Sequence, residues 1–144
     1  MNRFLLPLLA LLAFSAGRAA AQTAPLGDWL TAGASAVVKI TPCASGEGDL
    51  CGRIVWLWDP ATVTDARNSD RALRSRPLVG LEMLSGFRPG APGEWTGGRI
   101  YNPEDGNTYG ATLKLRDATT LDVRGCVMVF CRSQVWRRPS ALPR

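Results

Sequence analysis

The chain has 144 residues with no histidine, and its 17 basic and 12 acidic side chains leave a net charge of +5. This length suits one domain. The absence of histidine removes the commonest general base, the usual serine–histidine–aspartate arrangement and the imidazole metal ligands. The mild positive charge is not organised into the basic stripes with interleaved aromatics that nucleic-acid binders use, so nucleic acid is not expected as a partner.

The first 21 residues have the parts of a secretory signal peptide. Residues 1–3 are positive, residues 4–16 are apolar, and residues 19–21 are three alanines at a small-residue cleavage site. We expect cleavage after Ala21, which leaves residues 22–144 as one mature domain, periplasmic or secreted, with a net charge of +3. A membrane anchor is the less favoured alternative, because the apolar run is shorter than the ~20 residues that a spanning helix needs. No transmembrane segment is expected after cleavage.

Short runs with strand character follow one another along the mature domain. They lie at residues 27–31, 35–42, 51–59 and 78–84, in the two halves of 94–116, and at 120–126 and 131–138. Residues 61–77 show no alternation and form the longest irregular segment, the kind of loop that often serves as a lid or a binding loop. Residues 85–93 are rich in glycine and proline and are predicted to be a connection.

Eight short strands with almost no helix predict an all-β fold. We expect an eight-stranded up-and-down antiparallel barrel, with one long irregular loop between strands three and four. A barrel removes the exposed edges that an open eight-stranded sheet would leave. A two-sheet sandwich is the alternative.

The hairpin at 94–116 has the clearest pattern. Polar residues alternate with apolar ones from Thr108 to Arg116, after a turn that contains Pro103 and Gly106. A four-residue loop would pair Asn102 with Asn107. It would also put Thr96, Gly98 and Ile100 on the Tyr109 face, whereas a one-residue slip would put Trp95, Arg99 and Tyr101 there.

Four cysteines in an exported chain predict two disulfides, and three connectivities are possible. We favour the local pairs Cys43–Cys51 and Cys126–Cys131, because each brackets a predicted hairpin tip. A four-thiolate zinc site is the rival, but its usual ligand spacing is tighter than either pair here.

The cysteine pairs also predict which side chains face inward. Cys43 opposite Cys51 would set Val38 against Trp56 and Ala36 against Trp58. Cys126 opposite Cys131 would set Val123 against Gln134 and Leu121 against Trp136. The candidate lining of the lumen is Val38, Trp56, Trp58, Tyr109, Leu113, Val123, Arg132, Gln134 and Trp136.

Such a lining favours a small hydrophobic or amphipathic ligand. Aromatic rings offer apolar walls, small residues leave volume, and Gln134 with Arg132 would orient a polar head. The alternative is a core filled by its own side chains, since eight-stranded barrels occur in both forms.

Several motifs resemble one bacterial exported family, called domain of unknown function 2147. They are CGRIVWL at 51–57, RSRPL at 74–78, GGRIYNPEDG at 97–106, and GC with CRSQVW between 125 and 136. The resemblance covers nearly all of the mature domain and implies a lipocalin-like fold. Gly27-Asp28-Trp29 also resembles the lipocalin G-x-W pattern, which implies that Trp29 packs against an arginine from near the last strand at a closed barrel end. Arg138 best fits that arginine, and Gly27, Trp29 and Arg138 are expected to have this structural role.

Catalytic and metal-binding patterns are weak. Glu104 and Asp105 are adjacent carboxylates in a turn, where acids suit turn geometry, and the spacing of Asp65, Asn68 and Asp70 does not match a calcium loop. No cofactor and no metal are expected. The leading hypothesis is a non-enzymatic exported barrel that binds a small molecule in its lumen.

Two alternatives stay open. The first is an envelope protein–protein interaction module with a filled core, which the apolar tip Val127-Met128-Val129-Phe130 favours. The second is an enzyme that works without histidine.

Overall fold

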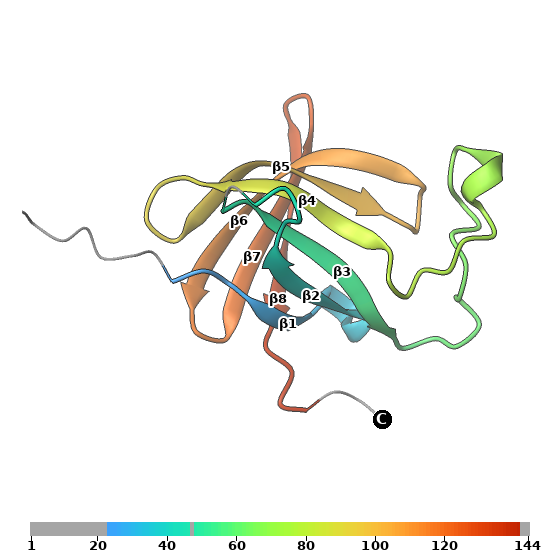
Figure 1. Ribbon diagram of the computed structural model, residues 1–144, viewed down its shortest axis with the longest axis horizontal. Coiled ribbons are helices and arrows are strands. Elements are labelled where there is room, and N and C mark those ends of the chain that lie inside the picture. Colours follow the sequence, from blue (N-terminus) through green and yellow to red (C-terminus); the bar gives the residue numbers. More distant parts are fainter. Residues whose placement is uncertain (1–22, 47, 142–144) are drawn as a thin grey trace, which may run out of the picture.

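The computed structural model describes residues 23–46 and 48–141 (Figure 1), so the predicted signal peptide lies outside the described residues. The described chain forms one closed antiparallel barrel in which each strand pairs with its neighbours in sequence. No helix in these two ranges is both long and apolar enough to cross a bilayer. The strands are β1 (Gly27–Leu30), β2 (Ala36–Pro42), β3 (Leu50–Leu57), β4 (Glu82–Pro89), β5 (Glu94–Asn102), β6 (Asn107–Asp117), β7 (Thr120–Val127) and β8 (Phe130–Arg137).

The predicted eight-stranded up-and-down barrel is therefore confirmed. Successive antiparallel strands make the connections alternate between two ends. One end, here called the loop end, carries the segment 58–81 between β3 and β4, the β5–β6 turn and the β7–β8 turn. The segment 58–81 contains the short 3₁₀ helix η2 (Arg71–Leu73), and a second one, η1 (Ala32–Ala34), joins β1 to β2.

Closure of the barrel depends on a short contact. Only the pair Leu30 and Arg137 joins β1 to β8. The remainder of β8 pairs with β7 alone, so the β7–β8 hairpin stands out beyond the barrel wall (Figure 1).

The fourth strand differs from the prediction for 78–84. It begins at Glu82 and continues through the glycine-containing stretch that was predicted to be a connection. Leu50 pairs with Phe87 but Gly52 pairs with Leu84, so β4 has one extra residue between these pairs. Gly86 lies there with φ +67° and forms a bulge within the strand instead of ending it.

Both predicted disulfides are present, but only one of them joins residues that are directly opposed on neighbouring strands. Cys126 and Cys131 are directly opposed, and the pairs Val123–Gln134 and Leu121–Trp136 follow as predicted. Cys43 instead lies just past the end of β2 and bridges diagonally to Cys51, which pairs with Thr41.

The predicted register of β2 and β3 is consequently wrong. Val38 pairs with Ile54, and Ala36 pairs with Leu57 after a bulge between Val37 and Val38. Neither Val38–Trp56 nor Ala36–Trp58 is a pair. The physical reason is that a disulfide needs its two Cα atoms within reach, here 4.9 Å, and does not need the residues to be directly opposed.

The 94–116 hairpin combines both predicted registers. Asn102 pairs with Asn107 and Ile100 with Tyr109, as a four-residue loop requires. A bulge at Gly97, whose φ is +70°, then shifts the pairing, so that Trp95 opposes Leu113 and turns into the core while Thr96 is exposed.

The end opposite the loop end is closed by Trp29 and Arg138. The guanidinium carbon of Arg138 lies 4.0 Å from the centroid of the buried Trp29 ring, as the G-x-W resemblance implies. Trp29 donates its indole N–H to the Pro25 carbonyl at 2.7 Å. Gly27 has φ +97°, and a Cβ there would lie 3.0 Å from the Arg138 guanidinium, so the close approach of this side chain favours glycine.

Candidate functional site at the loop end of the barrel

The inner half of the barrel nearest Trp29 is a packed core. Four of the predicted lining residues, Val38, Leu113, Val123 and Trp136, are buried in it together with Trp29 and Trp95. Well-packed interiors leave little space between side chains. These four residues therefore form a solid floor, and a ligand could contact them only if the core opened.

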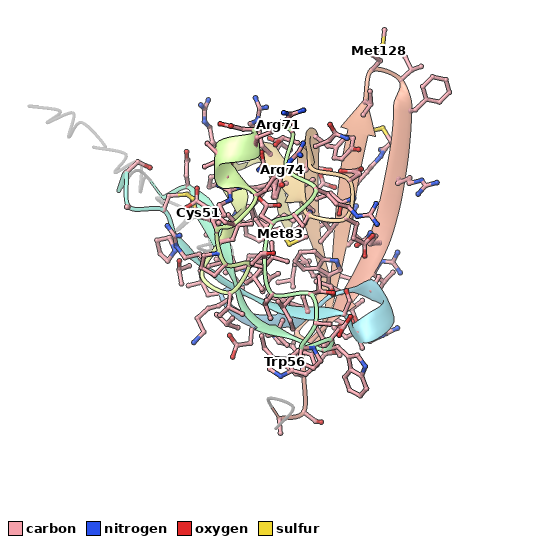
Figure 2. All side chains as sticks on the ribbon, turned by 90° about the vertical axis from the view of Figure 1, so that its right-hand side faces the viewer. Cys51, Trp56, Arg71, Arg74, Met83 and Met128 are labelled. Atoms are coloured by element: carbon pink, nitrogen blue, oxygen red, sulfur yellow. A yellow bond between two sulfur atoms is a disulfide. The ribbon has the colours of Figure 1, made fainter. Side chains whose placement is uncertain are left out.

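Four other predicted residues lie nearer the loop end, and we call them the rim: Trp56, Tyr109, Arg132 and Gln134. Trp56 and Tyr109 are half-buried, whereas Arg132 and Gln134 are exposed. Figure 2 views the protein from the side of the long loop, with Met83 near the middle and Trp56 at the lower edge. No hydrogen bond or ring contact within residues 23–46 and 48–141 joins Trp56 to the other three.

Trp58 does not belong to this lining. Its side chain is 69% exposed, and its ring meets Trp56 edge-on with the centroids 6.0 Å apart. Trp58 follows the last residue of β3, so strand alternation no longer determines which way it faces. The prediction that it lines the lumen is wrong.

Tyr109 is the centre of a small polar cluster on the rim. Its hydroxyl donates a hydrogen bond of 2.5 Å to the Asp105 carboxylate in the β5–β6 turn. This hydrogen bond raises the pKa of Tyr109, with weaker help from burial and the negative charge of Asp105, while the nearby charge of Arg132 acts in the opposite direction. Burial alone would raise the pKa of Asp105. Hydrogen bonds from Tyr109 and from the Asn107 backbone N–H instead hold this pKa below its ordinary value.

Gly125 leaves room for about one methyl group on the inner face beside Tyr109. A Cβ on Gly125 would lie 3.5 Å from an Ile100 methyl group and 3.8 Å from the Tyr109 Cβ. Gly125 pairs with Arg132 across β7 and β8. Ile100 and Tyr109 thus lie close to the backbone of Gly125, and a single methyl group would fill the space between them.

Gln134 connects the rim to the floor. Its side-chain carbonyl accepts the indole N–H of buried Trp136 at 3.1 Å. That hydrogen bond satisfies the only polar atom of the Trp136 side chain, which burial would otherwise leave without a partner. The Gln134 amide nitrogen has no hydrogen-bond partner among the described residues and is free to contact a ligand.

The long loop is fixed to the barrel by a buried carboxylate. Asp65 is 0% exposed, and one of its oxygens lies 2.8 Å from both Nε and Nη2 of Arg76. The same oxygen accepts the Asn68 amide at 2.8 Å, and the other accepts the hydroxyl of Tyr101 on β5 at 2.5 Å. The guanidinium carbon of Arg76 also lies 5.5 Å from the Tyr101 ring centroid. We call these four residues the loop anchor.

Gly106 makes a second contact between the loop and the β5–β6 turn. It has φ +74°, and a Cβ there would lie 2.0 Å from the Arg67 carbonyl oxygen. A hollow of about 420 Å³ separates the two segments beside this contact. Its walls are Thr62, Thr64, Ala66, Arg67, Leu78, Pro103 and Glu104. The loop therefore stands in a fixed position over the β5–β6 side of the loop end.

Comparison with known proteins places the chain in a family. The model of a bacterial family described as "Uncharacterized protein conserved in bacteria (DUF2147)" matches residues 27–138. The chain belongs to the DUF2147 family. No curated protein matches it. This family membership confirms the resemblance that the motifs indicate.

A solved structure shows the same fold. The Helicobacter pylori protein HP1028, described as belonging to the lipocalin family, superposes with a TM-score of 0.71 over 82% of this chain and 84% of that one. The two sequences are 19% identical, so the likeness concerns the fold. This DUF2147 protein has a lipocalin-like barrel.

The most important residues that sequence reasoning missed are those of the loop anchor. Asp65 and Asn68 resemble a poor calcium loop in the sequence, but their oxygen and nitrogen atoms bind Arg76 and Tyr101 instead. The one available signal is the length of the irregular segment 61–77, because a long loop without secondary structure needs an anchor to be ordered.

Proposed function

We propose that this DUF2147 protein is an exported, non-enzymatic barrel that binds one small amphipathic molecule at its loop end. The observation that carries the proposal is the rim. Two half-buried aromatic rings, an arginine and a glutamine with a free amide lie nearer the loop end than the apolar floor. The fold supports it further, since lipocalin-like barrels are built to hold a small ligand.

The packed floor limits how deep the ligand can reach. Because Trp136, Leu113 and Val123 are already packed, the apolar part of the ligand would rest on the floor and against Tyr109 and Trp56. Its polar or anionic head would meet Arg132, whose guanidinium has no ion-pair partner among the described residues. Arginine suits this role because its planar fork matches carboxylate and phosphate groups.

The proposal includes no catalysis. The chain has no histidine, and the rim carboxylate of Asp105 is engaged by Tyr109. Export is part of the proposal too. The two disulfides support it, because disulfides persist in oxidising compartments.

A fluorescent fatty-acid probe tests the rim. We expect saturable binding to the wild type, and about a tenfold loss in Arg132→Gln, since a charged group's hydrogen bonds are worth about 1.5–3 kcal/mol. The matched control is Arg88→Gln. Arg88 is an exposed arginine near the C-terminal end of β4, away from the loop end. Native mass spectrometry after mild purification should also show a retained small molecule.

Two results would remove the proposal. One is the absence of saturable probe binding together with no co-purifying molecule. The other is an equal loss in Arg132→Gln and Arg88→Gln, because this would mean that general positive charge, and not the rim, attracts the probe.

A further inference from the structure

The tip of the β7–β8 hairpin is the largest run of exposed apolar side chains in the described chain. Val127, Met128, Val129 and Phe130 are 49%, 92%, 86% and 79% exposed. Figure 2 shows Met128 at the far end of the projecting hairpin, distant from the remainder of the protein. A soluble domain gains nothing from exposing four consecutive apolar residues, so such a patch indicates a binding surface.

The residues of the turn do not suit its backbone conformation. Val127 pairs with Phe130, so Met128 and Val129 form a two-residue turn. Met128 has φ +52°, at a position where such hairpins usually have glycine. Local rules are broken in this way mainly at functional sites, where another requirement selects the residue.

The disulfide makes the tip rigid. Cys126 and Cys131 lie directly behind the Val127–Phe130 pair and hold the two strands together where β8 has no partner other than β7. A tip held in one conformation loses little conformational freedom when it binds. The hairpin is therefore suited to present its apolar residues without first becoming ordered.

On the hairpin itself, the charges behind the tip have one sign. Residues 123–136 contain Arg124 and Arg132 and no acidic residue. The nearest carboxylate on the strand, Asp122, is held by Arg116 in an ion pair. Arg124 has neither an ion pair nor a side-chain hydrogen bond within residues 23–46 and 48–141.

We propose that the β7–β8 tip docks on a phospholipid bilayer that contains anionic lipid. The apolar tip enters the boundary between headgroups and acyl chains, and Arg124 and Arg132 meet the lipid phosphates. Arg132 lies two residues behind Phe130 and Arg124 three residues behind Val127, which is about 7 Å and about 10 Å along a strand. Interfacial segments bury their apolar part to about 5–10 Å, so the arginines reach headgroup level when the tip is immersed.

A bilayer fits this surface better than a folded protein does. The tip is a convex projection, whereas protein interfaces place their apolar centre in a patch surrounded by a polar rim on the same surface. A fluid layer closes around a projection without a complementary pocket. The basic residues match anionic headgroups. Each Lys or Arg near the membrane surface raises the partitioning of a protein onto an anionic bilayer about fivefold.

Vesicle flotation tests the proposal with the mature disulfide-bonded protein. The vesicles are phosphatidylcholine alone, or phosphatidylcholine with one part in four of phosphatidylglycerol. We expect flotation with the anionic vesicles, weaker binding as salt rises, and a loss of about tenfold or more in Phe130→Ser, whose ring no longer enters the lipid. The matched apolar control is Val79→Ser in the long loop, where the side chain is 51% exposed.

A second pair of variants tests whether binding to anionic vesicles needs the arginines behind the tip. Arg124→Gln lies on the outer face, away from the rim, and should lower binding to anionic vesicles about fivefold while leaving binding to neutral vesicles unchanged. Arg88→Gln should have no effect. Because Phe130 and Arg124 are exposed, thermal unfolding should be nearly unchanged in both tip variants.

Three results would overturn the proposal. The wild type could fail to float with anionic vesicles at low salt, or Val79→Ser could lose as much binding as Phe130→Ser. The third is that Phe130→Ser abolishes a concentration-dependent dimer, measured by light scattering without lipid, while flotation is unaffected. That result would assign the tip to contacts between copies of this protein. None of the three bears on the rim, which is tested with a soluble probe.

Discussion

The hydroxyl of Tyr101 donates a 2.5 Å hydrogen bond to the carboxylate of Asp65, 36 residues earlier in the chain. Tyr101 is on β5 and Asp65 is in the long loop, so this one contact joins the loop to the barrel wall. A buried carboxylate is costly unless it is paired, and Arg76 supplies the opposite charge. The position of the loop therefore depends on the anchor.

Removal of the anchor's cation should release the loop. We expect Arg76→Ala to lower the free energy of unfolding by about 2 kcal/mol, below the cost for fully buried pairs, because the Arg76 side chain is 33% exposed. Urea unfolding measures this change. Limited trypsin digestion should also cut faster after Arg67 and Arg71.

Arg71→Ala is the matched control for that variant. Arg71 is exposed in the same loop, and its side chain has no ion pair or hydrogen bond among the described residues, so its loss should change stability by less than about 0.5 kcal/mol. Equal effects of the two substitutions would mean that the Asp65–Arg76 pair does not hold the loop.

The anchor should also make stability depend on alkaline pH. Burial, followed by the hydrogen bond and negative charge of Asp65, raises the pKa of Tyr101 above its ordinary value of 10.0. The folded state then binds the phenolic proton more tightly than the unfolded state. This stabilisation is complete below pH 10.0 and is lost as the pH rises through the folded-state pKa.

Comparison of the wild type with Tyr101→Phe isolates this effect, because Tyr109, the only other tyrosine, is present in both proteins. Unfolding free energies measured from neutral to alkaline pH should fall for the wild type, and the difference from Tyr101→Phe should shrink as Tyr101 ionises. A difference that is constant across this range would show that Tyr101 ionises equally in both states.

Gly106 offers a separate test of the loop's position. An alanine at a left-handed glycine costs about 1–2 kcal/mol from backbone strain alone. Gly46→Ala measures that cost alone, because Gly46 has φ +80° and open space around its Cβ position. Gly106→Ala should be more destabilising by about 1–3 kcal/mol, since its Cβ would meet the Arg67 carbonyl oxygen. Equal costs in urea unfolding would place the loop away from the β5–β6 turn.

Much of the barrel could be predicted because alternation and turn residues are local signals. The run from Thr108 to Arg116 alternates without interruption, and the observed β6 spans Asn107–Asp117. Bulges limit this reasoning. Gly86 lies in a stretch predicted to be a connection and Gly97 in a predicted strand, and both form bulges that shift the register of β4 and β5.

The site was harder to predict than the fold. Tyr109, Arg132 and Gln134 lie at the rim because β6 and β8 keep the predicted alternation. Trp58 follows the end of its strand, so alternation could not place it. The anchor could not be found either, because its partners Asp65 and Tyr101 lie far apart in the sequence and Asp65 is in a segment without periodicity.

The core has a close contact that a single methyl group should disturb. A Cβ on Gly98 would lie 2.3 Å from the ring of buried Phe87. We expect Gly98→Ala to cost about 2–3 kcal/mol through overpacking, and the double variant with Phe87→Leu to be less impaired than the sum of its two single changes. Gly110→Ala on the neighbouring strand is the control, because nothing lies within 4 Å of its Cβ position. Additive costs in the double variant would contradict the proposed ring contact.

The closed end of the barrel depends on Arg138. Arg138 stacks on Trp29 and donates hydrogen bonds to the Asp28 and Ala118 carbonyls at 3.3 Å. Arg138→Gln should lower the free energy of unfolding by about 1–2 kcal/mol, because a partly desolvated cation–π contact is lost with those hydrogen bonds. Arg138→Lys should recover part of the loss, since lysine keeps the charge but not the planar fork.

Arg137→Gln is the matched control, one residue earlier. The Arg137 side chain is exposed, and within the described part of the chain it makes one hydrogen bond, of 3.4 Å, to Thr120. Thermal unfolding followed by tryptophan fluorescence should show a lower midpoint and a changed emission for Arg138→Gln alone, because Trp29 loses its covering cation. If Arg137→Gln lowered the midpoint as much, the stabilisation would come from net charge near the C-terminus and not from the ring contact.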